Sequence, residues 1–129
     1  MIVVDASVVL EVLLQTPAAR RISDRIFDVG ETLHAPHLLD IEIAQALRRY
    51  ARSGTISADR GAEALADLAD LPLHRYPHFI FLRRIWKLRH NLTAYDAVYL
   101  SLAESLDAPL LTRDRALASA GGRVRVEVL

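Results

Sequence analysis

Cysteine is absent from this 129-residue sequence. Its absence excludes disulfide bonds, a thiolate nucleophile and any zinc site built on cysteine. Long apolar runs are also missing, because no stretch approaches the ~18 residues that a transmembrane helix needs. The apolar residues 1–4 lead directly into Asp5 and not into the core of a signal peptide. We therefore expect a cytoplasmic protein with no membrane segment.

An excess of charge of either sign is lacking as well, since 16 basic residues balance 16 acidic ones. This balance argues against a protein that holds nucleic acid by bulk electrostatic attraction alone. Fifteen of the 16 basic residues are arginine, the side chain best suited to phosphate, although a GC-rich genome would give the same bias. The hydrophobic fraction of 52% is high for a small monomer and indicates a surface that a partner covers.

Hydrophobic periodicity divides the chain into alternating strands and helices, with no linker, repeat or low-complexity tract. We expect a single domain over residues 1–129. The pattern predicts strands at 1–4, 32–35, 71–76, 109–112 and 123–129, the last as an edge strand. It predicts helices at 7–14, 17–28, 39–53, 57–70, 77–90, 95–106 and 114–120. Such alternation is typical of an α/β fold with three α/β/α layers around a central, mainly parallel twisted sheet.

Four acidic residues occupy equivalent places in this pattern. Asp5 and Asp114 directly follow predicted strands, and ligands of open parallel sheets bind outside the carboxyl ends of the strands. Glu42 and Asp96 lie in the first turns of predicted helices and flank the apolar stripe of each helix. If these helices begin near the carboxyl edge of the sheet, all four acids converge there.

Each acid taken alone has a structural explanation. Asp5 and Asp114 could cap the helices that follow them, Thr93 and Asp96 resemble a capping box, and Glu42 suits the positive end of its helix. Together they are harder to explain in this way, because carboxylates within ~4 Å repel by roughly 4 kcal/mol per pair at an effective dielectric near 20. Such a cluster needs a cation, and oxygen ligands alone favour Mg²⁺ or Mn²⁺ over zinc. Phosphodiester hydrolysis is the chemistry that uses sites of this kind.

Four sequence motifs carry a family resemblance. They are Val3-Val4-Asp5-Ala6-Ser7, Ile41-Glu42-Ile43-Ala44, Leu92-Thr93-Ala94-Tyr95-Asp96-Ala97 and Leu111-Thr112-Arg113-Asp114. In order and spacing they resemble the acidic motifs of PIN-domain nucleases, and most closely those of the VapC toxins of bacterial toxin–antitoxin pairs. The resemblance covers essentially the whole chain.

This resemblance implies a function and a set of residue roles. The protein would be a Mg²⁺-dependent (or Mn²⁺-dependent) endoribonuclease that hydrolyses RNA. Asp5 and Asp96 would be the principal metal ligands, while Glu42 and Asp114 would complete the acidic pocket.

The resemblance also implies supporting residues and protein partners. Ser7 and Thr112 match small hydroxyl positions that orient the acids, and Arg113 beside them is a candidate for contact with the substrate or with the acids. Gln45 departs from the family pattern, which often has Asn there, and this puts one contact near the acids or the substrate in doubt. The family implies a homodimer and a small cognate VapB-like antitoxin whose peptide arm blocks the pocket.

Other residues and functions are weaker candidates. The five histidines show no metal-ligand spacing, and the arginines of residues 48–52 and 83–89 are read first as solvated helix faces. A haloacid-dehalogenase phosphatase needs a second Asp two residues after Asp5, where Ser7 stands. The main alternative is a non-catalytic domain of the same fold that only binds RNA or protein.

Overall fold

A computed structural model describes all residues, 1–129. The strands are β1 (Ile2–Val4), β2 (Leu33–Pro36), β3 (Leu73–Tyr76), β4 (Leu110–Thr112) and β5 (Val126–Val128). The helices are α1 (Ala6–Leu13), α2 (Ala19–Ile26), α3 (Leu38–Arg52), α4 (Ala58–Asp70), the 3₁₀ turn η1 (Phe79–Phe81), α5 (Leu82–Lys87), α6 (Ala94–Leu106) and α7 (Arg115–Ala118). None of the helices combines the length and the hydropathy that a membrane crossing requires.

The five strands form one sheet in the order β3-β2-β1-β4-β5, and every neighbouring pair is parallel. The chain runs outward from β1 through β2 to β3 and then returns to the other side of β1 as β4. The change of direction lies between β1 and β4, and open parallel sheets bind ligands at the carboxyl ends of the strands at such a point. Asp5 and Asp114 follow these two strands.

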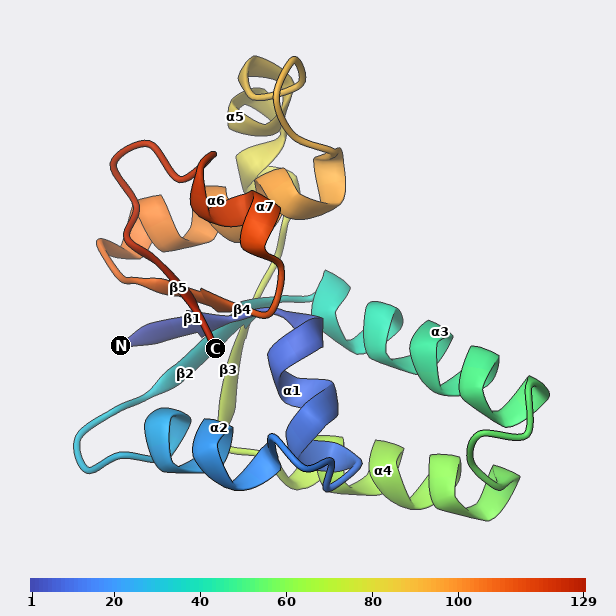
Figure 1. Cartoon of the computed structure of the whole chain (residues 1–129). Helices are drawn as coiled ribbons and strands as arrows, with labels where there is room; N and C mark the ends of the chain where they lie inside the picture. Colours follow the sequence, from blue (N-terminus) through green and yellow to red (C-terminus); the bar gives the residue numbers. More distant parts are fainter.

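Helices cover both faces of the sheet, as the sequence predicts (Figure 1). Helices α1 to α4 lie on one face, while α5, α6 and α7 lie on the other. Helix α6 packs across β1 and β2, and its buried residues from Ala97 to Ala103 join the core. The three-layer α/β/α fold expected from the strand–helix alternation is therefore confirmed.

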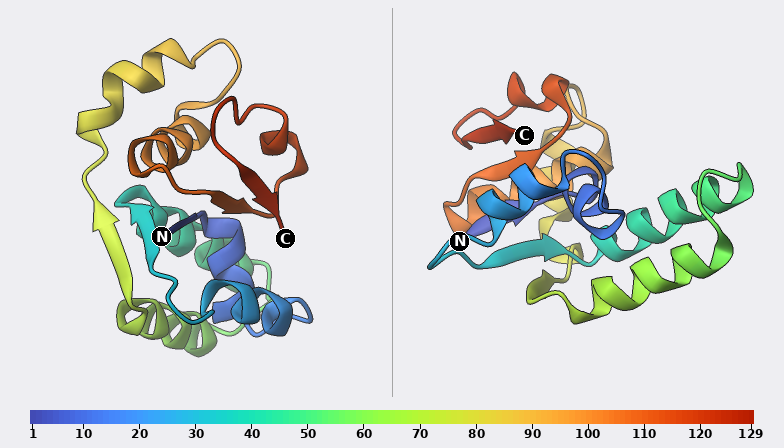
Figure 2. Two further views of the ribbon diagram at one scale, coloured as in Figure 1. Left: turned by 90° about the vertical axis from the view of Figure 1, so that its left-hand side faces the viewer. Right: turned by 60° about the horizontal axis from the view of Figure 1, so that its bottom comes forward.

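Helices α3 and α4 form an arm that extends beyond the sheet (Figure 2). They run side by side and are joined by a turn in which Gly54 has a φ of 78°. That left-handed conformation strains any residue with a Cβ, so glycine is required there. Helix α3 begins two residues after β2 ends, so the start of α3 lies at the carboxyl edge of the sheet.

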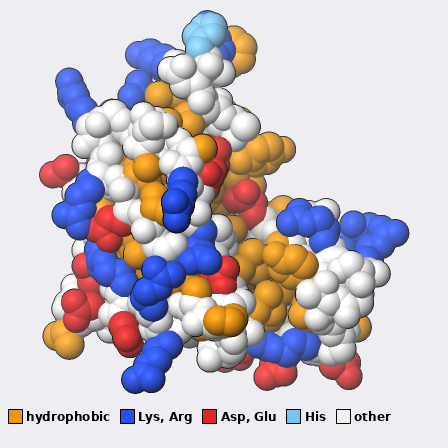
Figure 3. Space-filling view, viewed as in Figure 1, with side chains coloured by type: hydrophobic (Ala, Val, Ile, Leu, Met, Phe, Trp, Pro, Cys, Tyr) orange, Lys and Arg blue, Asp and Glu red, His pale blue; other side chains and the backbone are white.

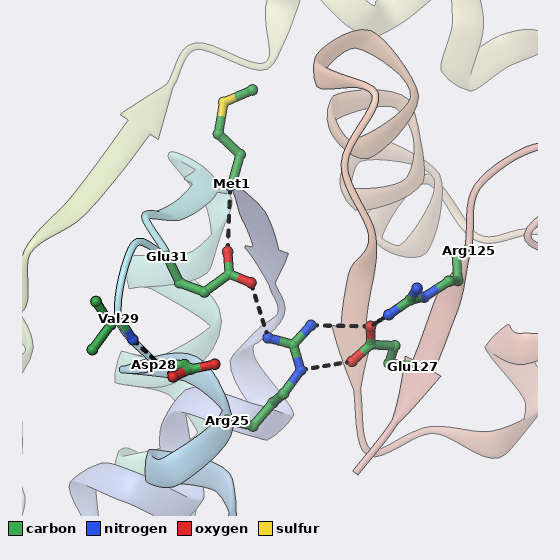
Figure 4. Close-up of polar contacts among 7 residues, drawn as sticks. All are labelled: Met1, Arg25, Asp28, Val29, Glu31, Arg125 and Glu127. Carbon is green, nitrogen blue, oxygen red and sulfur yellow. Dashed lines mark hydrogen bonds and ion pairs between the residues drawn. The ribbon is translucent and has the colours of Figure 1, made fainter.

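A network of charged groups fixes the C-terminal strand to α2 (Figure 4). The Arg25 guanidinium donates hydrogen bonds of 2.9 and 3.0 Å to the two carboxylate oxygens of Glu127 on β5, and one of 3.2 Å to Glu31. The N-terminal ammonium pairs with Glu31 as well, and Arg125 pairs with Glu127. We call these residues the Arg25 clasp.

Three local predictions were wrong. Residues 77–90 do not form one helix but divide into η1 and the short α5, because Phe79 to Leu82 are consecutive apolar residues and not a stripe at helical spacing. Helix α2 begins at Ala19, with Pro17 in the preceding turn. The helical spacing of Tyr95, Val98, Tyr99, Leu102 and Leu106 predicts one apolar face of α6, but Tyr95 is 62% exposed.

A candidate active site at the carboxyl edge of the sheet

Asp5 is buried between the end of β1 and the start of α1. Its Oδ1 accepts hydrogen bonds from the Ser7 hydroxyl (2.5 Å) and the Val8 backbone N–H (3.2 Å), and its Oδ2 accepts one from the Thr112 hydroxyl (2.5 Å). The carboxylate therefore caps α1 and also ties β1 to the end of β4. Both of its oxygens are held in place by donors.

The hydroxyls that hold Asp5 are themselves positioned by the backbone after β4. Ser7 Oγ accepts from the Arg113 N–H at 2.9 Å, and Thr112 Oγ1 accepts from the Asp114 N–H at 3.0 Å. Each hydroxyl thus donates its single proton to Asp5 and accepts a hydrogen bond from a backbone N–H of the segment between β4 and α7. The predicted hydroxyl positions lie next to the predicted acid.

Glu42 extends from the second turn of α3 and is half-buried. Its Oε1 accepts a 2.5 Å hydrogen bond from the hydroxyl of Tyr99, which comes from α6 on the opposite face of the sheet. Asp40, two residues earlier on the same helix, points elsewhere and pairs with Arg75 at 2.8 Å. Of the two acids near the start of α3, Asp40 is thus held in an ion pair and Glu42 is not.

Asp96 and Asp114 lie at the N-terminal ends of α6 and α7. Thr93 caps α6 by accepting a hydrogen bond from the Asp96 N–H at 3.2 Å, and Asp114 caps α7 by accepting one from the Ala116 N–H at 2.9 Å. The Thr93 hydroxyl also lies beside the Asp96 carboxyl group and acts to lower its pKa.

The electrostatics connect the four acids in a series. Burial raises the pKa of Asp5, and the hydrogen bonds from Ser7 and Thr112 oppose this rise. Burial, and then the charges of Asp5 and Asp96, raise the pKa of Glu42. Burial, and then the charge of Asp114, raise the pKa of Asp96. All three carboxyl groups therefore hold protons more tightly than usual, which is the electrostatic state that a cation relieves.

The four carboxylates do not share one cavity. Glu42 lines a groove of about 650 Å³ between α1 and α3, together with Ser7 and Arg113, while Asp96 and Asp114 line a second hollow of about 640 Å³. Asp5 lines neither hollow, but it accepts a hydrogen bond from Ser7, which lines the first. The single pocket expected from the sequence is thus two adjoining hollows, and no three of the acidic and histidine side chains are grouped tightly enough to hold an ion by themselves.

The groove between α1 and α3 combines apolar walls with charged ends. Figure 3 shows hydrophobic side chains lining the hollow between the main body and the α3–α4 arm, with basic groups at the far end of the arm. Arg49 lines the groove seven residues after Glu42, which is two helical turns along the same face of α3. The Arg113 guanidinium contacts Glu11 at 3.5 Å and donates to the Leu129 carbonyl at 2.9 Å.

Residues 2–123 match the family model described as the PIN domain. The chain belongs to the PIN-domain family. It is 45% identical over 121 residues to a VapC ribonuclease of Mycobacterium bovis, covering 94% of this chain and 91% of that protein. It is 43% identical over 121 residues to the VapC1 ribonuclease of Mycobacterium tuberculosis, covering 93% and 90%. These relatives place the chain among the VapC-type PIN-domain ribonucleases.

Solved structures share the PIN-domain fold. A protein from Pyrobaculum aerophilum, 27% identical, superposes with a TM-score of 0.70 over 96% of this chain and 81% of the other. A toxin–antitoxin complex from Klebsiella pneumoniae gives a TM-score of 0.71 at 16% identity, over 99% and 97% of the two chains. At 16% identity, the similarity to the Klebsiella pneumoniae complex shows a shared fold and nothing more.

Sequence reasoning missed Tyr99 as part of the site of this PIN domain. Its helical spacing with Val98 and Leu102 predicts a place in the apolar stripe of α6, and it is indeed buried, with 2% of its surface exposed. A buried phenol almost always finds a hydrogen-bond partner, and Tyr99 follows Asp96 by three residues on the same helix face. The need of a buried phenol for a partner and its position near Asp96 could together have predicted a hydrogen bond from Tyr99 to an acid of the cluster.

Proposed function

We propose that this PIN domain is a divalent-metal-dependent endoribonuclease that acts as the toxin of a VapBC-type toxin–antitoxin pair. The observation that carries the proposal is the series of carboxylates from Asp5 through Glu42 and Asp96 to Asp114. Burial raises the pKa of Asp5, Glu42 and Asp96, and neighbouring acids of the series raise the pKa of Glu42 and Asp96 further. The ribonuclease activity named for the mycobacterial relatives gives independent support.

The donor set fits a hard cation that keeps part of its water shell. Only carboxylate and hydroxyl oxygens are available at the site, and these suit Mg²⁺ or Mn²⁺. Since no three side chains enclose an ion on their own, water would complete the coordination, as Mg²⁺ prefers. Asp5 and Asp96 would be the principal ligands, and Glu42 and Asp114 would hold the ion through water or through a second ion.

The cation and the residues around it would have separate roles in hydrolysis. The bound cation would polarise an attacking water and shield the charge that develops on the phosphate. Ser7 and Thr112 keep both oxygens of Asp5 fixed before the ion arrives. Arg113, whose backbone N–H donates to Ser7 in the groove, is a basic group that would bind a phosphate of the RNA.

The α1–α3 groove is the proposed route for the RNA strand. Arg49 lies about 10 Å along α3 from Glu42, from the helix rise of 1.5 Å per residue. This cation is exposed and forms no ion pair, so it is available to a phosphate outside the cleaved linkage. The apolar walls of the same groove would also accept an amphipathic helix of a VapB-like antitoxin.

A second copy of the chain is the proposed partner for another exposed surface. Phe79, Ile80, Leu82 and Trp86 form an apolar surface on η1 and α5, and each of them is more than half exposed. We call it the η1–α5 surface. Apolar surface of this extent is uncommon on a monomer, and a symmetric dimer would bury it twice.

Cleavage of total cellular RNA tests the proposed activity. The protein is incubated with RNA in Mg²⁺, in Mn²⁺ and in EDTA, and new 5′ and 3′ ends are mapped. We expect cleavage only with a divalent cation, and none with Asp5→Asn. Asp40→Asn is the matched control, because Asp40 begins the same helix as Glu42 but pairs with Arg75, and it should retain cleavage.

Two outcomes would contradict the proposal. RNA that is retained by the protein but never cut, with or without metal, would identify a non-catalytic RNA-binding module. Equal cleavage by the wild type and Asp5→Asn in the presence of EDTA would exclude the acidic cluster as the site.

A further inference from the structure

Among the donors of the site, the hydroxyl of Tyr99 holds an unusual position. It is the only group that donates a hydrogen bond to the Glu42 carboxylate, and it does so at Oε1. The hydroxyl is buried beneath the groove with the rest of the side chain, which is 2% exposed, so it cannot touch a substrate. Any effect of this hydroxyl on the reaction must therefore pass through Glu42.

Glu42 needs such a restraint more than Asp5 and Asp114 do. A glutamate has one more rotatable side-chain bond than an aspartate and loses more conformational freedom when it is fixed. Asp5 is held by three donors and Asp114 by one backbone N–H within its own turn, whereas Glu42 receives no backbone N–H. Without Tyr99 its carboxylate would be repelled by Asp5 and Asp96 and would turn toward solvent.

The bond also leaves a definite part of Glu42 available. With Oε1 occupied by the phenol, Oε2 has no hydrogen-bond partner in the protein. Tyr99 follows Asp96 by one turn of α6, so a single helix supplies one acid of the cluster and the restraint on another. Mutation of a residue that orients a metal ligand typically lowers metal affinity by about 10-fold to 100-fold.

We propose that Tyr99 is a positioning residue for the metal site: its hydroxyl fixes Oε1 of Glu42 so that Oε2 faces the divalent cation or the water bound to it. This inference rests on the proposed function, because it assumes that the acidic cluster binds a cation. Tyr99 itself touches neither the ion nor the RNA. The consequence is that removing one oxygen atom, remote from the substrate, weakens binding of the metal.

The test is a titration of the metal-free protein with Mn²⁺, in which electron paramagnetic resonance measures the free ion. Tyr99→Phe removes the hydroxyl and keeps the ring, and we expect its dissociation constant for Mn²⁺ to rise by about 10-fold to 100-fold. Tyr95→Phe is the matched control, because Tyr95 lies one turn earlier on α6 with 62% of its surface exposed, and it should bind as the wild type does.

A double-mutant cycle separates positioning from a general loss of packing. In a Glu42→Ala background the carboxylate is gone, so Tyr99→Phe should change Mn²⁺ binding no further. An equal loss in both backgrounds would show that Tyr99 acts through the stability of α6 and would overturn the inference. The cycle compares folded proteins, whose far-UV circular dichroism is checked first.

Steady-state cleavage gives a second readout. Because Tyr99 does not contact RNA, Tyr99→Phe should lower kcat at subsaturating metal while KM for RNA stays within about two-fold. Wild-type affinity for Mn²⁺ in Tyr99→Phe would refute the positioning role alone. A wild-type protein that binds no Mn²⁺ at all would refute the metal-dependent function together with it.

Discussion

Asp5 and Asp114 show that a structural role and a chemical role can belong to the same carboxylate. Each caps the helix that follows it, through the N–H of Val8 and of Ala116 respectively. A cap hydrogen bond fixes the orientation of the carboxylate that accepts it, so it prepares the group for a ligand as well as ending the helix. The structural explanation of these residues and the proposed catalytic one therefore do not compete.

Asp96 provides a test of electrostatic strain, because burial and the charge of Asp114 outweigh the hydrogen bond from Thr93. Burial and Asp114 raise its pKa above the ordinary value, so the folded chain binds this proton more tightly than the unfolded chain does. The resulting stability is fully present below the ordinary pKa of about 4 and is lost as the pH rises through the raised value. At pH 7 the ionised Asp96 is a net cost to the metal-free fold.

We expect Asp96→Asn to increase the free energy of unfolding in EDTA by about 0.5 kcal/mol at pH 7, a small value because water screens a partly exposed group. The gain should disappear below about pH 4, where Asp96 is protonated in the wild type too. Urea denaturation of both proteins from pH 3.5 to 7 measures it. If the difference in unfolding free energy between Asp96→Asn and the wild type stays constant over this pH range, or changes sign, the ionised Asp96 does not destabilise the metal-free fold.

At the scale of the elements, the Arg25 clasp is the main attachment of β5 outside the sheet. Its hydrogen bonds to both oxygens of Glu127 join residues 102 positions apart and lower the pKa of that carboxyl group. A lowered pKa contributes stability above the ordinary glutamate value, and this stability is lost as the pH falls through the folded value. The clasp should therefore act at neutral pH and fail in acid.

We expect Arg25→Met to lower the free energy of unfolding by about 1–2 kcal/mol at pH 7, because Glu127 then stays partly buried without its main partner. The loss should shrink below about pH 4, where Glu127 begins to protonate in the wild type. Arg21→Met is the control, since Arg21 is exposed on the same helix and forms no ion pair. Equal destabilisation by the two substitutions would mean that the clasp contributes nothing specific.

The elements that the sequence predicts well are those with a strong local signal. Thr93 caps α6, as the predicted capping box requires, and Ser57, at the start of the helix predicted over 57–70, caps α4. Ile41 lies opposite Leu39 and Ile43 on the helical wheel, which predicts an outward position, and it is 68% exposed. The failure at residues 77–90 has a physical cause, because consecutive apolar residues give no period. Of η1 and α5 only Phe81 is buried, and Ile85 packs against the core partly buried.

For the site, position along the chain predicts which edge of the sheet an acid lies on, but not which cavity it faces. That is why the four acids were expected in a single pocket and are found beside two hollows. The contact between Glu42 and Tyr99 joins residues 57 positions apart across the sheet. Contacts of this kind depend on how α3 and α6 pack, which no local pattern encodes.

At the scale of the whole molecule, the η1–α5 surface predicts association. We expect a dimer at micromolar concentration by light scattering, and a monomer when Leu82→Asp and Trp86→Asp are combined. Both side chains are exposed, so these changes should leave the fold intact. Ile41→Asp, which introduces the same charge at an exposed apolar position on α3, should remain dimeric.

Trp86 also reports on this association directly, because it is the only tryptophan and is 67% exposed. Its fluorescence emission should move to shorter wavelength as the protein concentration rises through the dissociation constant of the dimer. A wild type that remains monomeric, with an emission maximum independent of concentration, would refute the dimer.

The order of the strands in the sheet has a consequence for how the protein is made. β1 leaves the ribosome first, yet its neighbour β4 and the Thr112 hydroxyl that holds Asp5 are synthesised more than 100 residues later. A nascent chain that has not reached β4 therefore has an open edge on its central strand and an acid cluster without Asp114. The complete set of four acids is therefore absent until Asp114 has been synthesised, and no fragment that ends before Asp114 carries it.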